Sequence, residues 1–223
     1  MKIGLIVGLI GSFSWVAAYI LIAWRGYKDI SYGMPLVPLA LNFSFEITFS
    51  FIYPLYLINA FSYINFVWLA IDSIIVYTFL KNGYKYFKNE FNSSKTEFYF
   101  LFILAFSTAF LIMIYGGIFF RDMPFCKGNM VESSILIALI QSIAVSVCFV
   151  LMFMQRRTCE GQSFLIGFLK FIGTPLVGIN YLLHHSEPFL YVLYLIIFIF
   201  DVWYIILIYQ QLKKEGHNPW IRI

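Results

Sequence analysis

The chain has 223 residues, of which 61% are hydrophobic and only 12% are charged, and its mean hydropathy is +0.84. Soluble domains carry about 25% charged residues, so the composition excludes an ordinary soluble domain. The net charge of +4 comes from scattered lysines and arginines. Because no cluster among them is dense enough to follow phosphates, no nucleic-acid partner is expected, and membrane lipids are the expected surroundings.

Apolar runs divide the chain into seven segments, each close to the ~20 residues that cross a hydrocarbon core. They lack the period of two that barrel strands show. We therefore predict an all-α membrane protein, a seven-transmembrane-helix bundle that forms one domain over residues 1–223. The predicted spans are about 3–24, 35–57, 63–81, 98–120, 133–154, 164–184 and 188–210. In the first, Gly4, Gly8 and Gly11 are expected to let a neighbouring helix approach closely.

Basic residues in the loops predict the orientation. One side holds eleven of them: Arg25, Lys28, Lys81, Lys85, Lys88, Lys95, Arg156, Arg157, Lys213, Lys214 and Arg222. The other side holds Lys2, Arg121 and Lys127. Since cytoplasmic loops are rich in Lys and Arg, we predict an outside or lumenal N-terminus and a cytoplasmic C-terminus. The membrane would be the bacterial inner membrane, or the endoplasmic reticulum in a eukaryote. The longest loops expected are 82–97 and 121–132.

Three carboxylates, Glu46, Asp72 and Asp201, fall deep inside predicted spans. At ~1.5 Å per residue they lie roughly 16, 14 and 20 Å from the starts of their spans. A charge at that depth costs about 2.5 to 3.5 kcal/mol on insertion scales. We therefore expect Glu46 above all to face a cavity or a partner. Lys170 lies near the start of its span and is expected to extend to the cytoplasmic interface; pairing with an acid or a substrate phosphate is the less favoured alternative.

Each carboxylate shares its helix face with polar and aromatic residues three, four or seven positions away. The residues concerned are Asn42, Ser50 and Tyr53 around Glu46, Asn65 and Trp68 around Asp72, and Tyr194, Phe198 and Tyr204 around Asp201. Burial and a neighbouring carboxylate both favour the protonated acid, so at least one of the three is expected to be a proton donor. Hydrogen bonding across helices, without any catalytic role, is the structural alternative.

Several short motifs occur in the order known from one family. Lys28–Asp29 followed by Tyr32–Gly33–Met34 matches its KDxxYGM loop, and Asn42 with Glu46 matches its NxxWE element, followed by Ile52–Tyr53–Pro54. The segment 72–77, the set Arg157, Gly161 and Ser163, and Asp201 match later elements. In these motifs, and over nearly its whole length, the chain resembles the paxilline-type integral-membrane terpene cyclases of fungal indole-diterpene and meroterpenoid pathways and their bacterial relatives.

This resemblance implies that Glu46 and Asp201 are the catalytic acids. Phe45 departs from the family, which usually has Trp before the Glu, so the cavity and hence the substrate are expected to differ. Glu46, alone or with Asp201, would protonate a terminal epoxide or alkene on a prenyl chain, and successive double bonds would attack the carbocation. The expected supporting or substrate-binding residues are Asp72, Asn42, Tyr53, Trp68, Tyr204 and Phe198.

The implied reaction is an intramolecular, isomerase- or lyase-type cyclisation of a lipophilic prenylated substrate. An upstream prenyltransferase or epoxidase is the implied partner in such a pathway. The chain contains neither DDxxD nor DxDD, the aspartate-rich motifs of soluble terpene synthases. We therefore predict a metal-independent, class II-like cyclase that has no cofactor, needs no magnesium and ionises no diphosphate.

Two other functions fit seven spans. The main alternative is a small-molecule or proton-coupled transporter, because midplane carboxylates occur in carriers too; neither half of the chain has a Pro-Gln motif. A retinal-type receptor is disfavoured because the last span, 188–210, contains no Lys for a Schiff base.

Overall fold

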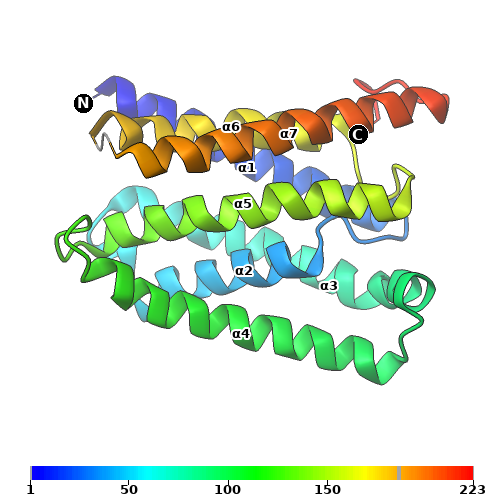
Figure 1. The fold of residues 1–223 in the computed structure, drawn as a ribbon, viewed down its shortest axis with the longest axis horizontal. Coiled ribbons are helices and arrows are strands. Elements are labelled where there is room, and N and C mark those ends of the chain that lie inside the picture. Colours follow the sequence, from blue (N-terminus) through cyan, green and yellow to red (C-terminus); the bar gives the residue numbers. More distant parts are fainter. Residues whose placement is uncertain (1, 185–186, 223) are drawn as a thin grey trace.

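A computed structural model describes residues 2–184 and 187–222, and these residues form helices and connecting turns, with no strand. Seven α-helices lie side by side along the long axis of the molecule (Figure 1). They are α1 (Lys2–Lys28), α2 (Leu36–Ile47), α3 (Ile64–Phe91), α4 (Lys95–Arg121), α5 (Met130–Arg156), α6 (Phe164–His184) and α7 (Pro188–Lys214). α6 and α7 lie on one side of α5, α2 and α4 lie on the other, and α1 packs against both α6 and α3.

Helices occupy all seven predicted segments. Five of them are long and apolar enough to cross a membrane, at 6–28, 64–91, 95–121, 130–156 and 188–214. Two shorter apolar stretches lie at 36–52 and 164–179. The predicted all-helical class is therefore confirmed, whereas the count of seven crossings and the orientation stay predictions.

The expected loop over 82–97 is wrong, because α3 continues to Phe91. No proline interrupts this stretch, and Gly83 allows the ring of Phe98 to pack against α3: a Cβ at Gly83 would lie 3.2 Å from that ring. Asn92, with φ of 51°, ends α3 in the left-handed conformation that closes many helices. Ser94 and Glu97 then form a capping box that starts α4. The connection between these two helices is therefore a tight turn.

Helices α1 and α6 approach each other closely at Gly11. A Cβ at Gly11 would lie 2.7 Å from the backbone nitrogen of Val177 and 2.9 Å from the carbonyl oxygen of Gly173. The predicted packing role is confirmed there. It is wrong for Gly8, where a Cβ would meet nothing within 4 Å, because Gly8 borders a cavity instead of a helix.

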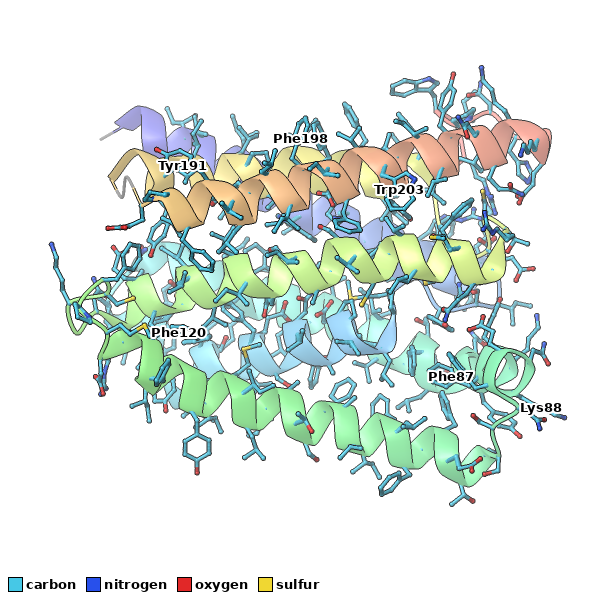
Figure 2. All side chains as sticks on the ribbon, in the orientation of Figure 1. Phe87, Lys88, Phe120, Tyr191, Phe198 and Trp203 are labelled. Carbon is cyan, nitrogen blue, oxygen red and sulfur yellow. The ribbon has the colours of Figure 1, made fainter. Side chains whose placement is uncertain are left out.

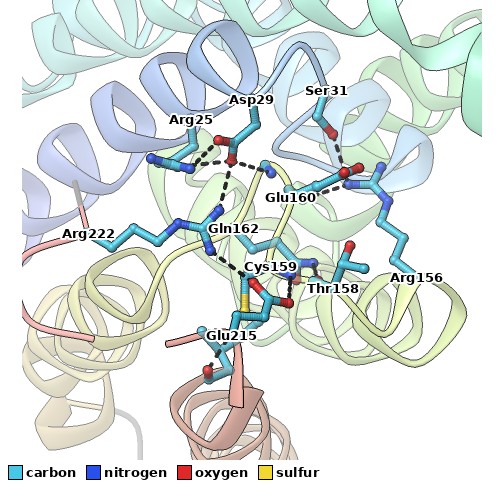
Figure 3. A network of polar contacts seen from close by, with 12 residues as sticks. Arg25, Asp29, Ser31, Arg156, Thr158, Cys159, Glu160, Gln162, Glu215 and Arg222 are labelled. Carbon is cyan, nitrogen blue, oxygen red and sulfur yellow. Dashed lines mark hydrogen bonds and ion pairs between the residues drawn. The ribbon is translucent and has the colours of Figure 1, made fainter. Parts of the chain in front are cut away.

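The loop after α1, the loop after α5 and the C-terminal tail meet at one end of the bundle (Figure 3). Asp29 is ion-paired with Arg25, accepts a hydrogen bond from the Gly161 backbone N–H at 2.8 Å, and contacts the Arg222 guanidinium at 3.4 Å. Gly161, with φ of 71°, has room for no Cβ, which would lie 2.5 Å from the Tyr32 carbonyl oxygen. One carboxylate thus joins three segments that are distant in sequence.

Arg156 reinforces the same end of the bundle. Its guanidinium lies 3.8 Å from the ring centre of Tyr32 and 4.2 Å from that of Tyr86, and it donates to the Tyr32 and Glu160 carbonyl oxygens, each at 3.1 Å. Cation–π contact of this kind adds to the hydrogen bonds. The contacts that join these loops thus involve three residues of the sequence motifs, Asp29, Tyr32 and Gly161.

Gly11 and Gly8 of α1 give a matched test of this packing. We expect Gly11→Ala to destabilise the protein by about 1 to 3 kcal/mol, because the added methyl would overlap the α6 backbone. Gly8→Ala, on the same helix but facing open space, should not lower stability. Thermal unfolding in detergent, followed by circular dichroism, measures both. Equal melting temperatures for the two variants would contradict the packing described.

Candidate active site

Glu46 lies at the end of α2, directly before a change in helix type. Residues Thr48–Ile52 form a π-helical turn, in which the Tyr53 N–H donates to the Thr48 carbonyl oxygen, five residues back, at 2.8 Å. Pro54 then ends the segment, since proline has no N–H to continue it. Such π-turns are frequent at functional sites. The Glu46 residue is only 2% exposed.

A cavity of about 120 Å³ lies in the middle of the bundle, and its lining includes Trp15, Tyr19, Asn42, Glu46, Trp68 and Gln141. The prediction that Glu46 faces a cavity is confirmed, and Asn42 and Trp68 of the predicted supporting residues join it there. None of the described residues that line the cavity is Lys or Arg. The described lining is thus aromatic and hydrogen-bonding, and Glu46 is the only ionisable group in it apart from tyrosines.

A chain of hydrogen bonds crosses three helices along one wall of this cavity. The Gln141 amide of α5 donates to the Asn42 side-chain oxygen at 3.3 Å, and the Asn42 amide nitrogen of α2 donates to the Tyr19 hydroxyl of α1 at 2.6 Å. Sequence reasoning missed Tyr19 and Gln141. Gln141 carries a usable signal, because it is the single side-chain amide within the predicted span 133–154.

Asp72 of α3 is fully buried and lies close enough to Glu46 for their charges to interact, and Tyr19 lies within electrostatic reach of both. Among the described residues, neither Asp72 oxygen has a hydrogen-bond partner, and Glu46 Oε2 has none either. Two buried carboxyl groups thus lie on the packed helices α2 and α3. Asp72 itself is not among the residues that line the cavity.

Asp201 does not join this pair. It is bound by Lys170 of α6, and each of the two residues is 1% exposed. Lys170 also donates to the Ser146 hydroxyl of α5 at 2.9 Å. The expectation that Lys170 extends to the interface is therefore wrong. An internal carboxylate within reach offers the ammonium a partner, so this charge is paired inside the bundle.

The remaining predicted residues lie away from the Glu46 cavity. Asp201 and Phe198 border a separate groove of about 310 Å³ between α6 and α7. Phe198 is 53% exposed and points outward from α7 (Figure 2). The Tyr53 hydroxyl donates to the Ile114 carbonyl oxygen at 3.2 Å, and Tyr204 is buried with its ring 5.4 Å from that of Phe149. Neither tyrosine lines the cavity.

Two residues form the wall between the cavity and the groove. Thr174 and Tyr194 border both spaces. Tyr194 reaches this position because Gly178 has no side chain, since a Cβ there would lie 1.5 Å from the tyrosine hydroxyl oxygen. Within the described part of the chain, no group of three or more His, Cys, Asp or Glu side chains is placed to hold a metal ion.

Comparison with known proteins identifies the family of this chain. Residues 2–215 match the family of Pyr4-like transmembrane terpene cyclases. The chain belongs to this family. Together with its apolar helices, this membership supports an integral membrane location. The resemblance inferred from the motifs is thereby confirmed.

Individual relatives come from fungi. The Pyr4-family terpene cyclase mfmH of Annulohypoxylon moriforme is 32% identical over 160 residues, which cover 72% of this chain and 62% of that protein. Terpene cyclase ascF of Acremonium egyptiacum is 43% identical over 75 residues, 33% of this chain and 26% of that protein. Terpene cyclase pyr4 of Aspergillus fumigatus is 33% identical over 67 residues, 30% and 27% respectively. The chain thus spans less than two thirds of these relatives. No solved structure matches it.

The buried ion pair can be tested through stability. Lys170→Met leaves the Asp201 carboxylate buried without its cation, and we expect a loss of about 3 to 5 kcal/mol. The double variant Lys170→Met/Asp201→Leu contains no unpaired charge, so it should recover most of that loss. Thermal unfolding of the single and double variants measures the coupling. The losses of stability in Lys170→Met and in Asp201→Leu would simply add in the double variant if the two residues did not interact, and that result would contradict a direct ion pair.

Proposed function

We propose that this protein is a membrane terpene cyclase in which Glu46 protonates a terminal epoxide or alkene of a prenylated substrate. The observation that carries the proposal is a buried carboxyl group that faces an aromatic cavity whose described lining contains no cation. Membership of the Pyr4-like family supports the reaction class, and the relatives compared above are named as terpene cyclases.

The surroundings of Glu46 favour the acid over the carboxylate. Removing an unpaired charge from water is costly, and here neither Lys nor Arg lines the cavity to offset that cost. A second buried carboxyl group, Asp72, lies on α3, which packs against α2, and two negative charges at such a site would repel each other. Glu46 therefore holds a proton in the resting protein and can give it to a weakly basic oxygen or alkene.

Proton transfer from Glu46 to an epoxide oxygen breaks the bond between that oxygen and its more substituted carbon. Each neighbouring double bond then gives its electron pair to the cationic carbon, which forms a ring bond and moves the charge along the chain. The rings of Trp15, Phe45 and Trp68 line the cavity and stabilise the cation by cation–π contact. A second carboxylate or a water takes the last proton, so the overall reaction is an isomerisation.

Asp201 acts in this proposal as a positioning residue. Lys170 lies one helical turn from Thr174, which lines the cavity, and the Thr174 hydroxyl donates to the Lys170 carbonyl oxygen at 3.1 Å. Asp201 and Ser146 hold the ammonium of Lys170. Without Asp201, the Lys170 ammonium would be buried without its carboxylate partner, and a cation that turned toward the cavity would favour the carboxylate form of Glu46.

Glu46 can be tested by removing its acidic proton. With a farnesylated phenol that carries a terminal epoxide, we expect Glu46→Gln to lower turnover about 10² to 10⁴-fold, because the amide has no acidic proton to give. The control is Asp122→Asn, which changes an exposed carboxylate at the end of α4. Products are identified by mass spectrometry in membranes of equal expression.

Turnover of the Glu46→Gln variant at the parent rate would reject the proposal. Flux of intact substrate into proteoliposomes, without cyclised product, would instead favour the transporter alternative.

Two variants distinguish a role of Asp201 in positioning Lys170 from a role as proton donor. Asp201→Asn should lower turnover, because it leaves the buried Lys170 ammonium without its carboxylate partner. Adding Lys170→Met removes that cation, so the double variant should regain turnover relative to Asp201→Asn alone. A double variant as inactive as Asp201→Asn, yet folded by thermal unfolding, would identify Asp201 as a direct acid.

A further inference from the structure

The groove between α6 and α7 is open to the surroundings of the bundle. Leu195 and Phe198 line it and are 57% and 53% exposed. Phe198 points outward and lies roughly 15 Å along α7 from Pro188 (Figure 2), well inside a hydrocarbon core about 30 Å thick. In an integral membrane protein, this groove therefore opens to lipid chains and not to water.

The chemistry of the groove suits a hydrocarbon chain. Its volume of about 310 Å³ is large enough for a small-molecule site, since such sites measure about 300 to 1,000 Å³. The polar residues among its described lining are Thr174, Tyr194 and Asp201. The carboxylate of Asp201 is paired with Lys170. A chain of isoprene units can thus lie in the groove without facing an unpaired charge.

A thin wall separates this groove from the Glu46 cavity. Thr174 and Tyr194 border both spaces. Tyr194 comes from α7, and its hydroxyl occupies the place that a side chain at Gly178 of α6 would take. Among the described residues, that hydroxyl forms no hydrogen bond. Nothing polar therefore holds the Tyr194 ring in the wall, and a change of side-chain rotamer would remove it.

Helix α6 is weakened beside the same wall. Pro175 lies inside this helix and lines the groove. Proline has no N–H to donate to the carbonyl oxygen of Phe171, four residues earlier, so the helix can bend there. Phe171 lines the groove as well. The part of α6 that borders both spaces is thus the part that can most easily move away from α7.

We propose that the groove between α6 and α7 is the entrance through which the prenyl chain of the substrate passes from the membrane to the Glu46 cavity, and that Tyr194 opens and closes it. The proposal rests on the proposed function for the identity of the substrate. Continuity of the groove with the cavity wall favours the chain of the substrate over that of a resident phospholipid, which has the same apolar chemistry.

Blocking the groove tests the entrance. Leu195→Trp fills the groove from an exposed position of α7. Radiolabelled farnesyl phenol, which has no epoxide and cannot react, should then associate with the protein in nanodiscs, and dissociate from it, about tenfold more slowly than with the parent. The Kd should stay the same, because an obstacle on the path alters both rates and leaves the bound state unchanged.

Ile199→Trp is the matched control. Ile199 is 52% exposed on the same helix and is not among the residues that line the groove. This variant should keep both rates of the parent. Unchanged rates in Leu195→Trp would overturn the entrance. A weaker Kd with an unchanged association rate would also overturn it, because the groove would then be part of the binding site itself.

Tyr194 should act in the opposite direction. Tyr194→Ala removes the ring from the wall, so farnesyl phenol should associate about tenfold faster than with the parent. Tyr194→Phe keeps the ring and lacks only the hydroxyl, which forms no hydrogen bond among the described residues. It should therefore keep the parent rate. An association rate of Tyr194→Ala equal to or below that of the parent would show that this residue does not control entry.

Photolabelling identifies the chain that occupies the groove. A farnesyl phenol with a diazirine on its chain should label the segment 188–214, and unlabelled farnesyl phenol should prevent this labelling. A diazirine phospholipid that labels the same segment and is not displaced by farnesyl phenol would make the groove a lipid site and overturn the proposal. Rates that change as predicted, combined with full turnover by Glu46→Gln, would keep the entrance and reject the proposed reaction.

Discussion

The pairing of Lys170 with Asp201 sets the charge balance in the middle of the bundle. The single positive charge of Lys170 can neutralise one carboxylate, and Asp201 is the carboxylate that it neutralises. Glu46 and Asp72 are buried as well, on the packed helices α2 and α3, and no ion pair to either is found among the described residues. The proposed acid chemistry at Glu46 would then depend on an interaction made by two residues that do not line its cavity. Buried ion pairs contribute little net stability, so a role in arranging charge is a better account of this one.

Helix α1 shows how the same residue type can produce contact and space. At Gly11 the absence of a side chain brings the α6 backbone close, and at Gly8, three residues earlier, it leaves a chamber open. The tight contact fixes the distance between the helices near Thr174 and Val177, which line the cavity. The rigid contact at Gly11 fixes the spacing of α1 and α6. The space beside Gly8 can therefore stay open without the two helices collapsing into it.

Much of this arrangement follows from the sequence. Apolar runs predicted all seven helices, and the cost of an internal charge predicted that Glu46 faces a cavity. The continuation of α3 was missed although its signals, Asn92 and the S-x-x-E motif at Ser94, are legible. The partner of Lys170 is different in kind: Asp201 is 31 residues away, and which side chains meet across helices depends on rotations that periodicity does not determine. Tyr19 was hidden among many membrane aromatics for the same reason.

The π-turn at Thr48–Ile52 has a consequence for how this family can change. A π-turn contains one residue more than a regular α-helix needs, so the loss of one residue there can return this stretch to α-helix while the residues before it keep their places. Asn42 and Glu46 precede the turn and line the cavity, whereas Leu55, Asn59 and Ser62 follow it and line a separate space of about 280 Å³. A single-codon insertion or deletion in this stretch is thus a way to move the second set of residues without moving the acid.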